Sequence, residues 1–383
     1  MTACWPLVPL GALVECLDAR RVPLNRAQRA RRPGPVPYHG ASGVVGHVDQ
    51  ALFDGPLVLL GEDGAPFLDP MRDVAFFHDG PLWAGNHVHV LRPRPGVDGR
   101  FLAHALNTVS YAPDVDATTR PKLVRARMNS LPVPCPPPDR QRMIAHKLDP
   151  ALSRIDRQLD ELAHQARLAR ELGHSEILHA LSHGGAGCVR PLGSVFTITG
   201  GGTPSTSRPD YWGDEVSWIT PADLPAGPPA WVRHGARGLS FAGLAACRAT
   251  RVAAGALVIS TRAPVGRVGM GASALAVSQG CKALVPRGRE VDLRYAALAL
   301  HAAAAELRRR AGGSVFPELD TASLASLDLY LPPLATQHAV ARAVGARLER
   351  MAAQDRERAR MAALLREYRM AVRRAAMNGY LPR

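Results

Sequence analysis

The chain has 383 residues, of which 46% are hydrophobic, and its formal net charge is +14 at pH 7. This length allows two or more domains with cores of their own, and 33 prolines and 35 glycines without a collagen-like period indicate many loops and short strands rather than a fibre. The charge favours a polyanionic partner, most simply a nucleic acid. All basic residues except Lys122, Lys147 and Lys282 are arginine, so a single arginine is not informative by itself.

The cysteines and the hydropathy indicate that the chain is neither a disulfide-rich, a zinc-binding nor a membrane protein. The six cysteines form no C-x-x-C pair and have no histidine at zinc spacing, so we expect neither a disulfide framework nor a metal site. No stretch approaches the roughly 20 apolar residues of a membrane span. The apolar start of the chain lacks the basic segment of a signal peptide and is interrupted by Pro6 and Pro9, so we expect no signal peptide. We therefore expect no membrane association and a cytoplasmic location.

Short apolar runs predict strands in both halves of the chain. Residues 57–60 (LVLL) and 256–260 (ALVIS) lie between glycine or proline and read as buried strands. Residues 86–91 (NHVHVL) alternate as a half-exposed strand, which places His87 and His89 close together without a third ligand candidate. Residues 294–310 predict an alanine-rich helix that closes at Gly312 and Gly313.

A second pattern predicts long helices. From Leu148 to Ala169, apolar residues recur at alternating spacings of four and three, as in a coiled-coil seam. Residues 151–182 would form a helix of about 48 Å, although an ordinary core helix can carry the same stripe. We expect the seam to pack against a second, antiparallel helix. The residues expected in this contact are Leu152, Ile155, Leu159 and Leu162 on one side and Leu348, Met351 and Leu365 on the other.

The second helix is expected because the chain contains an internal repeat. Residues 121–182 match residues 317–378 without a gap at an offset of 196, and the shared positions include Gln141 and Gln337. Upstream, the P-L-G of residues 9–11 recurs at residues 191–193 with an offset of 182. The plan is therefore a variable region followed by a constant region, twice, with residues 184–187 as a flexible joint.

The glycine-rich stretch TGGGTPS at residues 199–205 and the acidic residues after it raise three enzymatic alternatives. A phosphate-binding P-loop needs a lysine after its last glycine, and no lysine in the chain follows a glycine. A dinucleotide site needs a helix after the glycines, which Pro204 and Pro209 would break. The acidic residues that follow, Asp214 and Glu215, lack the nearby lysine of a metal-dependent nuclease. We therefore expect a structural turn followed by a strand.

The order of several short motifs, together with the repeat, resembles the specificity subunit of type I restriction-modification systems over nearly the whole chain. In the first half the motifs are PYHGASGVVG (37–46), LGEDG (60–64), NH (86–87), PKL (121–123) and LPVPCPPPDRQ (131–141). In the second half they are TGGGTPS (199–205), WIT (218–220), STRAPVG (260–266), SQG (278–280) and LDLYLPPLATQ (327–337). The chain departs from the family pattern at Arg140 and Thr336, where a glutamate is usual.

The resemblance implies an α+β fold with an internal pseudo-twofold repeat, in which two long antiparallel coiled-coil helices separate two globular target-recognition domains. The expected segments are target-recognition domain 1 (1–130), helical spacer 1 (131–183), target-recognition domain 2 (184–326) and helical spacer 2 (327–383). It also implies sequence-specific binding of a bipartite double-stranded DNA target. Catalysis would belong to partners, namely methyltransferase subunits with S-adenosylmethionine and a restriction subunit that uses ATP and Mg²⁺. This chain would hold no cofactor and no catalytic residue.

Two groups of side chains are candidates for DNA contact. Six arginines without an acidic neighbour are expected to form part of the DNA-facing surface of the first domain: Arg20, Arg21, Arg26, Arg29, Arg31 and Arg32. The alternative is a solvated arginine-rich loop. In the second domain, Arg262 and Gln279 lie at loop ends where polar side chains could reach a groove, the alternative being that they cap the backbone.

Two other classes of function remain open. A helical scaffold that binds only protein would not need the +14 charge or two glycine-rich globular regions. An enzyme acting on nucleic acid would need one of the catalytic motifs that the chain lacks. A gel shift with duplex DNA separates the scaffold from the others, and an activity assay of the isolated chain separates the enzyme.

Overall fold

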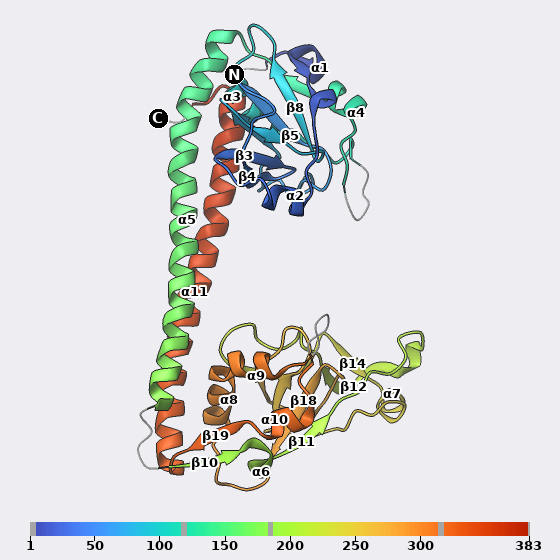
Figure 1. The fold of residues 1–383 in the computed structure, drawn as a ribbon, viewed down its shortest axis with the longest axis vertical. Coiled ribbons are helices and arrows are strands. Elements are labelled where there is room, and N and C mark those ends of the chain that lie inside the picture. Colours follow the sequence, from blue (N-terminus) through green and yellow to red (C-terminus); the bar gives the residue numbers. More distant parts are fainter. Residues whose placement is uncertain (1–4, 116–120, 183–186, 313–317, 382–383) are drawn as a thin grey trace. The chain divides into compact units, whose positions relative to one another are not determined.

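The computed structural model describes residues 5–115, 121–182, 187–312 and 318–381. Its longest elements are two helices, α5 (Pro138–Ser182) and α11 (Leu334–Met377) (Figure 1). The described residues divide into two compact units. Unit 1 extends to Ala163 and resumes at Arg358, whereas unit 2 runs from His164 to Glu357. Most of the joint expected at residues 184–187 lies outside the described residues.

Both long helices begin directly after prolines. Helix α5 starts at Pro138, the last residue of a Pro-Pro-Pro run, and α11 starts at Leu334 after Pro332 and Pro333. Proline suits the first helical turn because its missing N–H has no partner there and its φ is already helical. The helix expected over residues 151–182 is therefore longer at its N-terminal end and contains Pro150.

Unit 1 is built from short strands and helices around one main apolar cluster. Its strands are β1 (Leu7–Pro9), β2 (Val14–Cys16), β3 (Val36–Gly40), β4 (Gly43–Val48), β5 (Leu57–Gly61), β6 (Ala75–His78), β7 (Trp83–Ala84), β8 (Val88–Pro93) and β9 (Pro132–Pro134). Its short helices are α1 (Leu10–Leu13), η1 (Asp18–Arg20), α2 (Arg26–Ala30), α3 (Gly99–Leu106) and α4 (Arg125–Ser130). Helix α3 and the first half of α5 bury Phe101, Leu102 and Leu148 in the main cluster.

Unit 2 contains the same kinds of element. Its strands are β10 (Cys188–Pro191), β11 (Phe196–Gly200), β12 (Trp212–Ile219), β13 (Ala230–Val232), β14 (Arg237–Leu239), β15 (Leu257–Ser260), β16 (Val268–Gly271), β17 (Leu275–Val277), β18 (Cys281–Pro286) and β19 (Asp328–Leu331). Its short helices are α6 (Leu192–Val195), η2 (Pro209–Tyr211), α7 (Phe241–Ala245), α8 (Leu293–Ala302), α9 (Ala304–Arg310) and α10 (Thr321–Ala325).

The two units share one strand topology. A four-stranded order β2-β8-β5-β6 in unit 1 corresponds to β11-β18-β15-β16 in unit 2, where β13 adds a fifth strand. A three-stranded sheet, β4-β3-β7, corresponds to β14-β12-β17, and in both the last pair is parallel. A small antiparallel pair joins the start of each half to the segment before its long helix, β1 with β9 and β10 with β19. The predicted mixed α+β fold is confirmed, and the repeat extends into regions that share little sequence.

The predicted buried strands are confirmed, but two other elements differ from expectation. Residues 57–61 form β5, which is buried throughout, and residues 257–260 form β15. Strand β8 was expected to be half-exposed, yet its residues 88–91 are all buried because β2 and β5 flank it and apolar clusters cover both faces. The helix expected over residues 294–310 is two helices, α8 and α9, which meet at Ala303.

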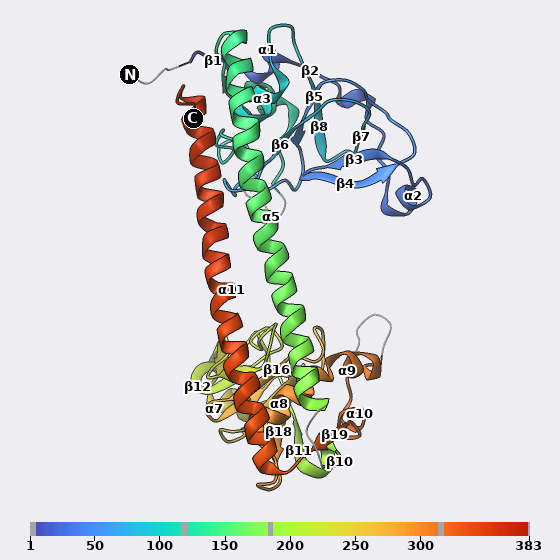
Figure 2. The same cartoon turned by 90° about the vertical axis from the view of Figure 1, so that its left-hand side faces the viewer.

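Within each unit the two long helices run antiparallel and pack together (Figures 1 and 2). In unit 1, Leu152 and Ile155 are buried and Leu159 and Leu365 are partly buried in one apolar cluster. Leu162 shares a shallow hollow with Leu365. The expected partners Leu348 and Met351 lie instead in unit 2, where they approach Gly173. The expected pairing is therefore wrong for these two residues. In an antiparallel pair, residues near the start of α11 lie beside residues near the end of α5, so Leu348 and Met351 meet Gly173 and not Leu152 or Ile155.

A buried glutamine connects the start of each long helix to its unit. Gln141 accepts a hydrogen bond from the Asp98 N–H at 2.9 Å and donates to the carbonyl of Pro136 at 2.8 Å. Gln337 accepts from the Asp292 N–H at 2.8 Å and donates to the carbonyl of Pro332 at 2.9 Å. Asp98 and Asp292 are themselves the N-caps of α3 and α8. The shared glutamine of the proline-rich motif is therefore a structural bracket, which explains why both copies carry it.

Replacing Gln141 by alanine is expected to lower the free energy of unfolding by about 1–3 kcal/mol, because it leaves the buried Asp98 N–H and Pro136 carbonyl without their partner. Gln158→Ala is the matched control, since Gln158 is exposed on the same helix. Urea unfolding of both variants measures the difference. Equal stability of the two variants would show that the bracket contributes nothing.

Two of the three glycines in residues 199–205, Gly201 and Gly202, are required by close approach of backbone segments, whereas a Cβ at Gly200 would meet nothing within 4 Å. A Cβ at Gly201 would lie 2.2 Å from the carbonyl oxygens of Val277 and Ser278, which no side chain allows. Trp218 donates from Nε1 to the Gly202 carbonyl at 3.0 Å and is 6% exposed. Trp212 packs edge to face against Trp218, with ring centroids 5.3 Å apart. The stretch is thus a structural connection between β11 and β12, as expected, and Trp218 is a packing residue.

Candidate nucleic-acid interface

The arginine-rich segment of unit 1 folds as η1, a connecting loop and α2. Asn25 caps α2 by accepting from the Gln28 N–H, while the Gln28 side chain accepts from the Asn25 N–H, so the short helix begins at a capping box. Arg29 donates to the Leu24 carbonyl at 2.7 Å and covers the ring of Tyr38. Arg32 pairs with Asp49 at 3.0 Å and covers Trp83. These contacts hold α2 against β3 and β4.

The six arginines fall into two groups by their contacts. Arg26 and Arg31 are exposed, and the side chain of neither makes a hydrogen bond or ion pair within the part of the chain that the structure describes. Arg20 is exposed as well and lies over the ring of Phe53. Arg21, Arg29 and Arg32 are engaged internally. Arg26 and Arg31 are therefore the members of the segment whose charge is fully available to a phosphate.

Arg21 belongs to a charged network at the edge of β8. It pairs with Glu62 at 2.6 Å and with Asp18 at 3.5 Å, and it donates to the Val88 carbonyl at 2.8 Å. Its side chain is 15% exposed. These contacts are those of a structural residue that joins η1 to β5 and β8. The sequence grouped Arg21 with five other arginines between residues 20 and 32, and a contact of Arg21 with DNA stays a prediction.

The same network contains three potential metal ligands that the sequence did not place together. Among the described residues, Cys16, Asp18 and His89 bring their ligand atoms within 4.8 Å of one another. His89 is buried, with Nδ1 at 2.6 Å from Asp18 Oδ2 and Nε2 at 2.9 Å from the Leu123 carbonyl. Burial alone would raise the pKa of Asp18, but the hydrogen bonds from His89 and Val90 hold that pKa below its usual value. Both ring nitrogens are engaged by oxygen acceptors, so the arrangement is that of a structural brace.

A hollow of about 920 Å³ with a mixed polar and apolar lining lies beside α2 in unit 1. Four segments that carry the first-half motifs converge on it: the end of β3 with the following turn, the residues after β5, the residues before β8, and Pro121. Asn25 and Arg29 of the α2 segment complete its rim, and Asp63, Asn86 and His87 contribute polar side chains. His87 pairs with Asp63 at 3.2 Å. Sequence motifs that are far apart in the chain thus line one concave surface.

In unit 2, Arg262 and Gln279 lie on neighbouring loops. The Arg262 N–H donates to the Gly280 carbonyl at 3.3 Å, so the two loops are hydrogen-bonded side by side. Arg262 pairs with Glu318 at 3.0 Å and stays 46% exposed. The Gln279 side chain is exposed and makes no hydrogen bond within the described chain, so no contact supports the alternative that it caps the backbone.

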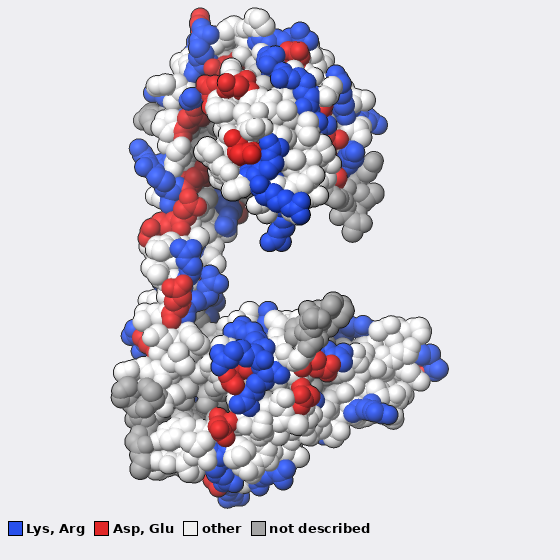
Figure 3. Space-filling model, viewed as in Figure 1, with Lys and Arg blue, Asp and Glu red and all other residues white. Residues whose placement is uncertain are grey.

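Further basic side chains gather on α9 of unit 2, which the sequence had not indicated as a binding element. Arg308 and Arg309 are exposed, and Arg309 and Arg310 pair with Glu306 of the same helix. Figure 3 shows Lys and Arg clustered over α9 and over the α2 region of unit 1. Each unit therefore presents a basic patch, on α2 in one and on α9 in the other.

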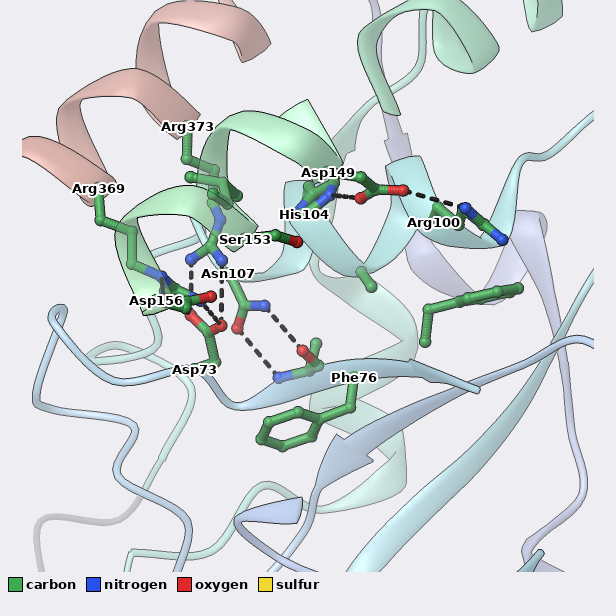
Figure 4. Close-up of a pocket in the computed structure, with 14 residues that line it drawn as sticks. Asp73, Phe76, Arg100, His104, Asn107, Asp149, Ser153, Asp156, Arg369 and Arg373 are labelled. Carbon is green, nitrogen blue, oxygen red and sulfur yellow. Dashed lines mark hydrogen bonds and ion pairs between the residues drawn. The ribbon is translucent and has the colours of Figure 1, made fainter. Parts of the chain in front are cut away.

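A smaller cavity of about 340 Å³ in unit 1 is lined by charged residues that pair with one another (Figure 4). Arg369 and Arg373 of α11 both bind Asp73, at 2.7 and 2.6 Å, and Arg369 also binds Asp156 of α5 at 2.7 Å. Burial would raise the pKa of Asp73, but the two guanidinium groups hold it far below its usual value.

On the opposite wall of this cavity, His104 lies 2.7 Å from Asp149, and Arg100 also pairs with that carboxylate. Hydrogen bonding from His104 lowers the pKa of Asp149. Asn107 accepts from the N–H groups of Val74 and Ala75. The charged side chains of the cavity are thus paired with one another, in a way that ties both long helices to the sheet of unit 1, whereas the buried Arg373 Nε has no hydrogen-bond partner.

Comparison with known proteins identifies the family. The model of the type I restriction modification DNA specificity domain matches residues 5–164 and again residues 188–346. The chain belongs to this family. The two matches fall on the two topologically equivalent halves of the chain, so each half carries one specificity domain.

Two individual relatives in sequence are also type I specificity subunits by name. A stretch of 141 residues, 37% of the chain, is 31% identical to the putative type I restriction enzyme specificity subunit S.HindORF215P of Haemophilus influenzae. A stretch of 154 residues, 40% of the chain, is 28% identical to the type I restriction enzyme MjaIX specificity subunit of Methanocaldococcus jannaschii. The matched stretches cover 36% of the length of each of these two relatives.

A solved structure also shares the fold of this specificity-family chain. It comes from work on complex assembly and conformational transition of the type I R-M system, and it superposes with a TM-score of 0.69 over 99% of both chains at 19% identity. Separately, none of the helices in the described ranges is long and apolar enough to cross a membrane.

The basic patch on α2 gives a testable expectation for a specificity-family protein. Replacing both Arg26 and Arg31 by alanine should weaken binding to duplex DNA and reduce the slope of log affinity against log salt by about one unit for each phosphate that is no longer neutralised. Arg125→Ala with Arg127→Ala is the matched control, because both are exposed on α4 of the same unit and carry the same charge. Fluorescence anisotropy over a salt series measures both. A salt slope that stays the same in the α2 variant would remove this patch from the interface.

Proposed function

We propose that this chain is the specificity subunit of a type I restriction-modification complex, which reads a bipartite target in double-stranded DNA and directs adenine methylation or restriction by partner subunits. The observation that supports this proposal is the duplication itself. One chain contains two specificity domains with the same strand topology, each followed by one of two long helices. Two reading units in one molecule are suited to two half-sites.

The basic patches supply a physical basis for DNA affinity. Exposed arginines on α2 and α9 are suited to neutralising phosphates, which positions a protein on the duplex without reading its sequence. Sequence is read by polar side chains at base edges in the major groove, where arginine pairs with guanine and carboxamides pair with adenine. Arg262 and Gln279 are candidates for such contacts in unit 2.

The chemistry is assigned to partners. Methyltransferase subunits would carry S-adenosylmethionine and methylate adenine, and a restriction subunit would use ATP and Mg²⁺. We place this assembly in the cytoplasm. The residues of this chain support the division of labour, because the histidines and carboxylates of the two concavities in unit 1 are engaged in internal pairs such as His104 with Asp149 and His87 with Asp63.

The proposal is tested by co-expressing the chain with its cognate methyltransferase subunit in a host that lacks adenine methylation, followed by genome-wide mapping of methylated adenines. The expected result is one bipartite motif with an unread gap of constant length. A continuous motif, or no motif from an assembled complex, would overturn the proposal. A gel shift with duplex DNA in parallel excludes a scaffold that binds only protein.

A further inference from the structure

The shared topology of the two units relates positions that a sequence comparison does not. Strand pairing aligns β8 with β18, because Val88 pairs with Gly61 at the end of β5 and Cys281 pairs with Ser260 at the end of β15. Asn86 lies two residues before β8, and Gln279 lies two residues before β18. The two residues therefore occupy one equivalent position in the repeated fold.

Hydrogen bonds before this position agree with the alignment. The residue preceding Asn86, Gly85, donates its N–H to the His39 carbonyl at 2.9 Å. The residue preceding Gln279, Ser278, donates its N–H to the Ile219 carbonyl, also at 2.9 Å. His39 in β3 and Ile219 in β12 are themselves equivalent, because each pairs with the last residue of the parallel strand.

Hydrogen bonds after this position agree as well. The carbonyl of His87 accepts from the Glu62 N–H at 2.9 Å, and the carbonyl of Gly280 accepts from the Thr261 N–H at 2.8 Å. The backbone that carries each amide is thus held on both sides by the sheet framework. A side chain mounted in this way is oriented by rigid elements rather than by a free loop.

The side chains at this position have the same chemistry. The chain contains thirteen asparagines and glutamines among its 383 residues, so a carboxamide in both copies of one position does not follow from composition. Asn86 and Gln279 are both exposed, and their carboxamides make no hydrogen bond to the residues that the structure describes, whereas the residues on either side are largely buried. Exposed, rigidly mounted and unpaired amides point outward to a partner.

We infer that Asn86 and Gln279 are the equivalent adenine-reading side chains of the two specificity domains, an inference that rests on the proposed function. A carboxamide accepts from the adenine N6 amino group and donates to N7, which makes it the side chain suited to this base in the major groove. In unit 1 the amide lines the hollow beside α2, whose rim includes Arg29.

The residue on the neighbouring loop differs in charge between the two specificity domains. Thr261 and Glu62 are equivalent by their hydrogen bonds, so the next residues, Arg262 and Asp63, are equivalent as well. A cation therefore stands beside Gln279 and an anion beside Asn86. Arginine favours guanine and a carboxylate favours cytosine. The same amide position thus serves two half-sites with different neighbouring bases.

The test compares the methylated motif of the wild-type complex with those of Asn86→Ala and Gln279→Ala complexes. Each variant is expected to lose discrimination at one base position of one half-site, with a loss of roughly 10- to 100-fold in affinity for the original target. The other half-site should stay the same. The matched controls are Gln158→Ala and Gln354→Ala, because these exposed glutamines are repeat equivalents on α5 and α11.

The isosteric variants Asn86→Asp and Gln279→Glu separate reading from folding. A carboxylate accepts from cytosine N4 and cannot donate to adenine N7, so the base preference at the affected position should shift toward cytosine. A bipartite wild-type motif that persists unchanged in all four variants overturns the inference and leaves the proposed function standing. Loss of folding in both the alanine and the isosteric variants, seen by thermal melting, also overturns it. A wild-type complex without a bipartite motif refutes the proposed function itself.

Discussion

Replacing Arg373 by alanine is expected to lower the free energy of unfolding by about 3 kcal/mol, because it leaves a mostly desolvated carboxylate, whose side chain is 18% exposed, without one of its two cations. Arg373 is 1% exposed and binds Asp73 through both terminal nitrogens, at 2.6 and 3.0 Å. The contact joins the end of α11 to the segment before β6. Chemical denaturation followed by circular dichroism measures the loss.

The next residue on the same helix supplies the control. Arg374 is exposed and its side chain has no hydrogen bond or ion pair in the described ranges, so Arg374→Ala should change stability by a few tenths of a kcal/mol at most. The double variant Asp73→Asn with Arg373→Met should be less destabilised than the sum of the two single variants, since it removes the unmatched charge. Equal losses for Arg373→Ala and Arg374→Ala would contradict the structural role of the pair.

The same pair makes stability depend on pH in a defined direction. The pKa of Asp73 is lower in the folded chain than in the unfolded chain, where it is about 3.9. Its stabilising contribution is therefore complete above about pH 5 and declines as the pH falls through and below the unfolded value. Asp73→Asn should flatten this acid limb of the stability curve.

Inserting one heptad into each long helix, after Ala163 in α5 and after Glu357 in α11, is expected to lengthen the unread gap of the methylated motif by about three base pairs. Seven helical residues add about 10 Å, a base pair adds about 3.4 Å, and a heptad keeps an apolar seam nearly in phase. Both half-sites should remain the same, because each specificity domain is unaltered. Methylation should be weaker, since about three base pairs also rotate the duplex by nearly a third of a turn.

Insertion into α5 alone is the control, because it shifts the two helices against each other and should prevent assembly. The methylated motif of the double-insertion complex is mapped by sequencing. If the complex assembles and still methylates only the original spacing, the helices do not set the distance between half-sites.

The excess of positive charge on α11 suggests a further contact of this helix with DNA or with a partner subunit. Residues 341–383 hold eleven basic and four acidic residues, whereas residues 139–183 hold seven of each. Part of the excess is used internally, because Arg369 and Arg373 bind Asp73 and Asp156. The remaining charge is a solvated helical face or a surface for DNA backbone or partner subunits, and a salt series of DNA binding on variants of the α11 arginines distinguishes these.

The sequence by itself determined the features that depend on neighbours along the chain. Heptad spacing around Leu152 predicted the long helices, uninterrupted apolar runs predicted β5 and β15, and the offset of 196 between Gln141 and Gln337 revealed the repeat. These signals are local or in register, so they are visible before any contact is known. The family followed from the order of such motifs.

Only the tertiary structure decided which polar residues face inward. Arg21 finds Glu62 and Val88 from distant parts of the chain, and Asp73 meets Arg373 across 300 positions. A free arginine and a paired arginine look alike in sequence, because the partner that desolvates the charge is supplied by another strand or helix. The equivalence of Asn86 and Gln279 was hidden for a related reason, because the regions between the repeated motifs differ in length and only strand pairing restores their register.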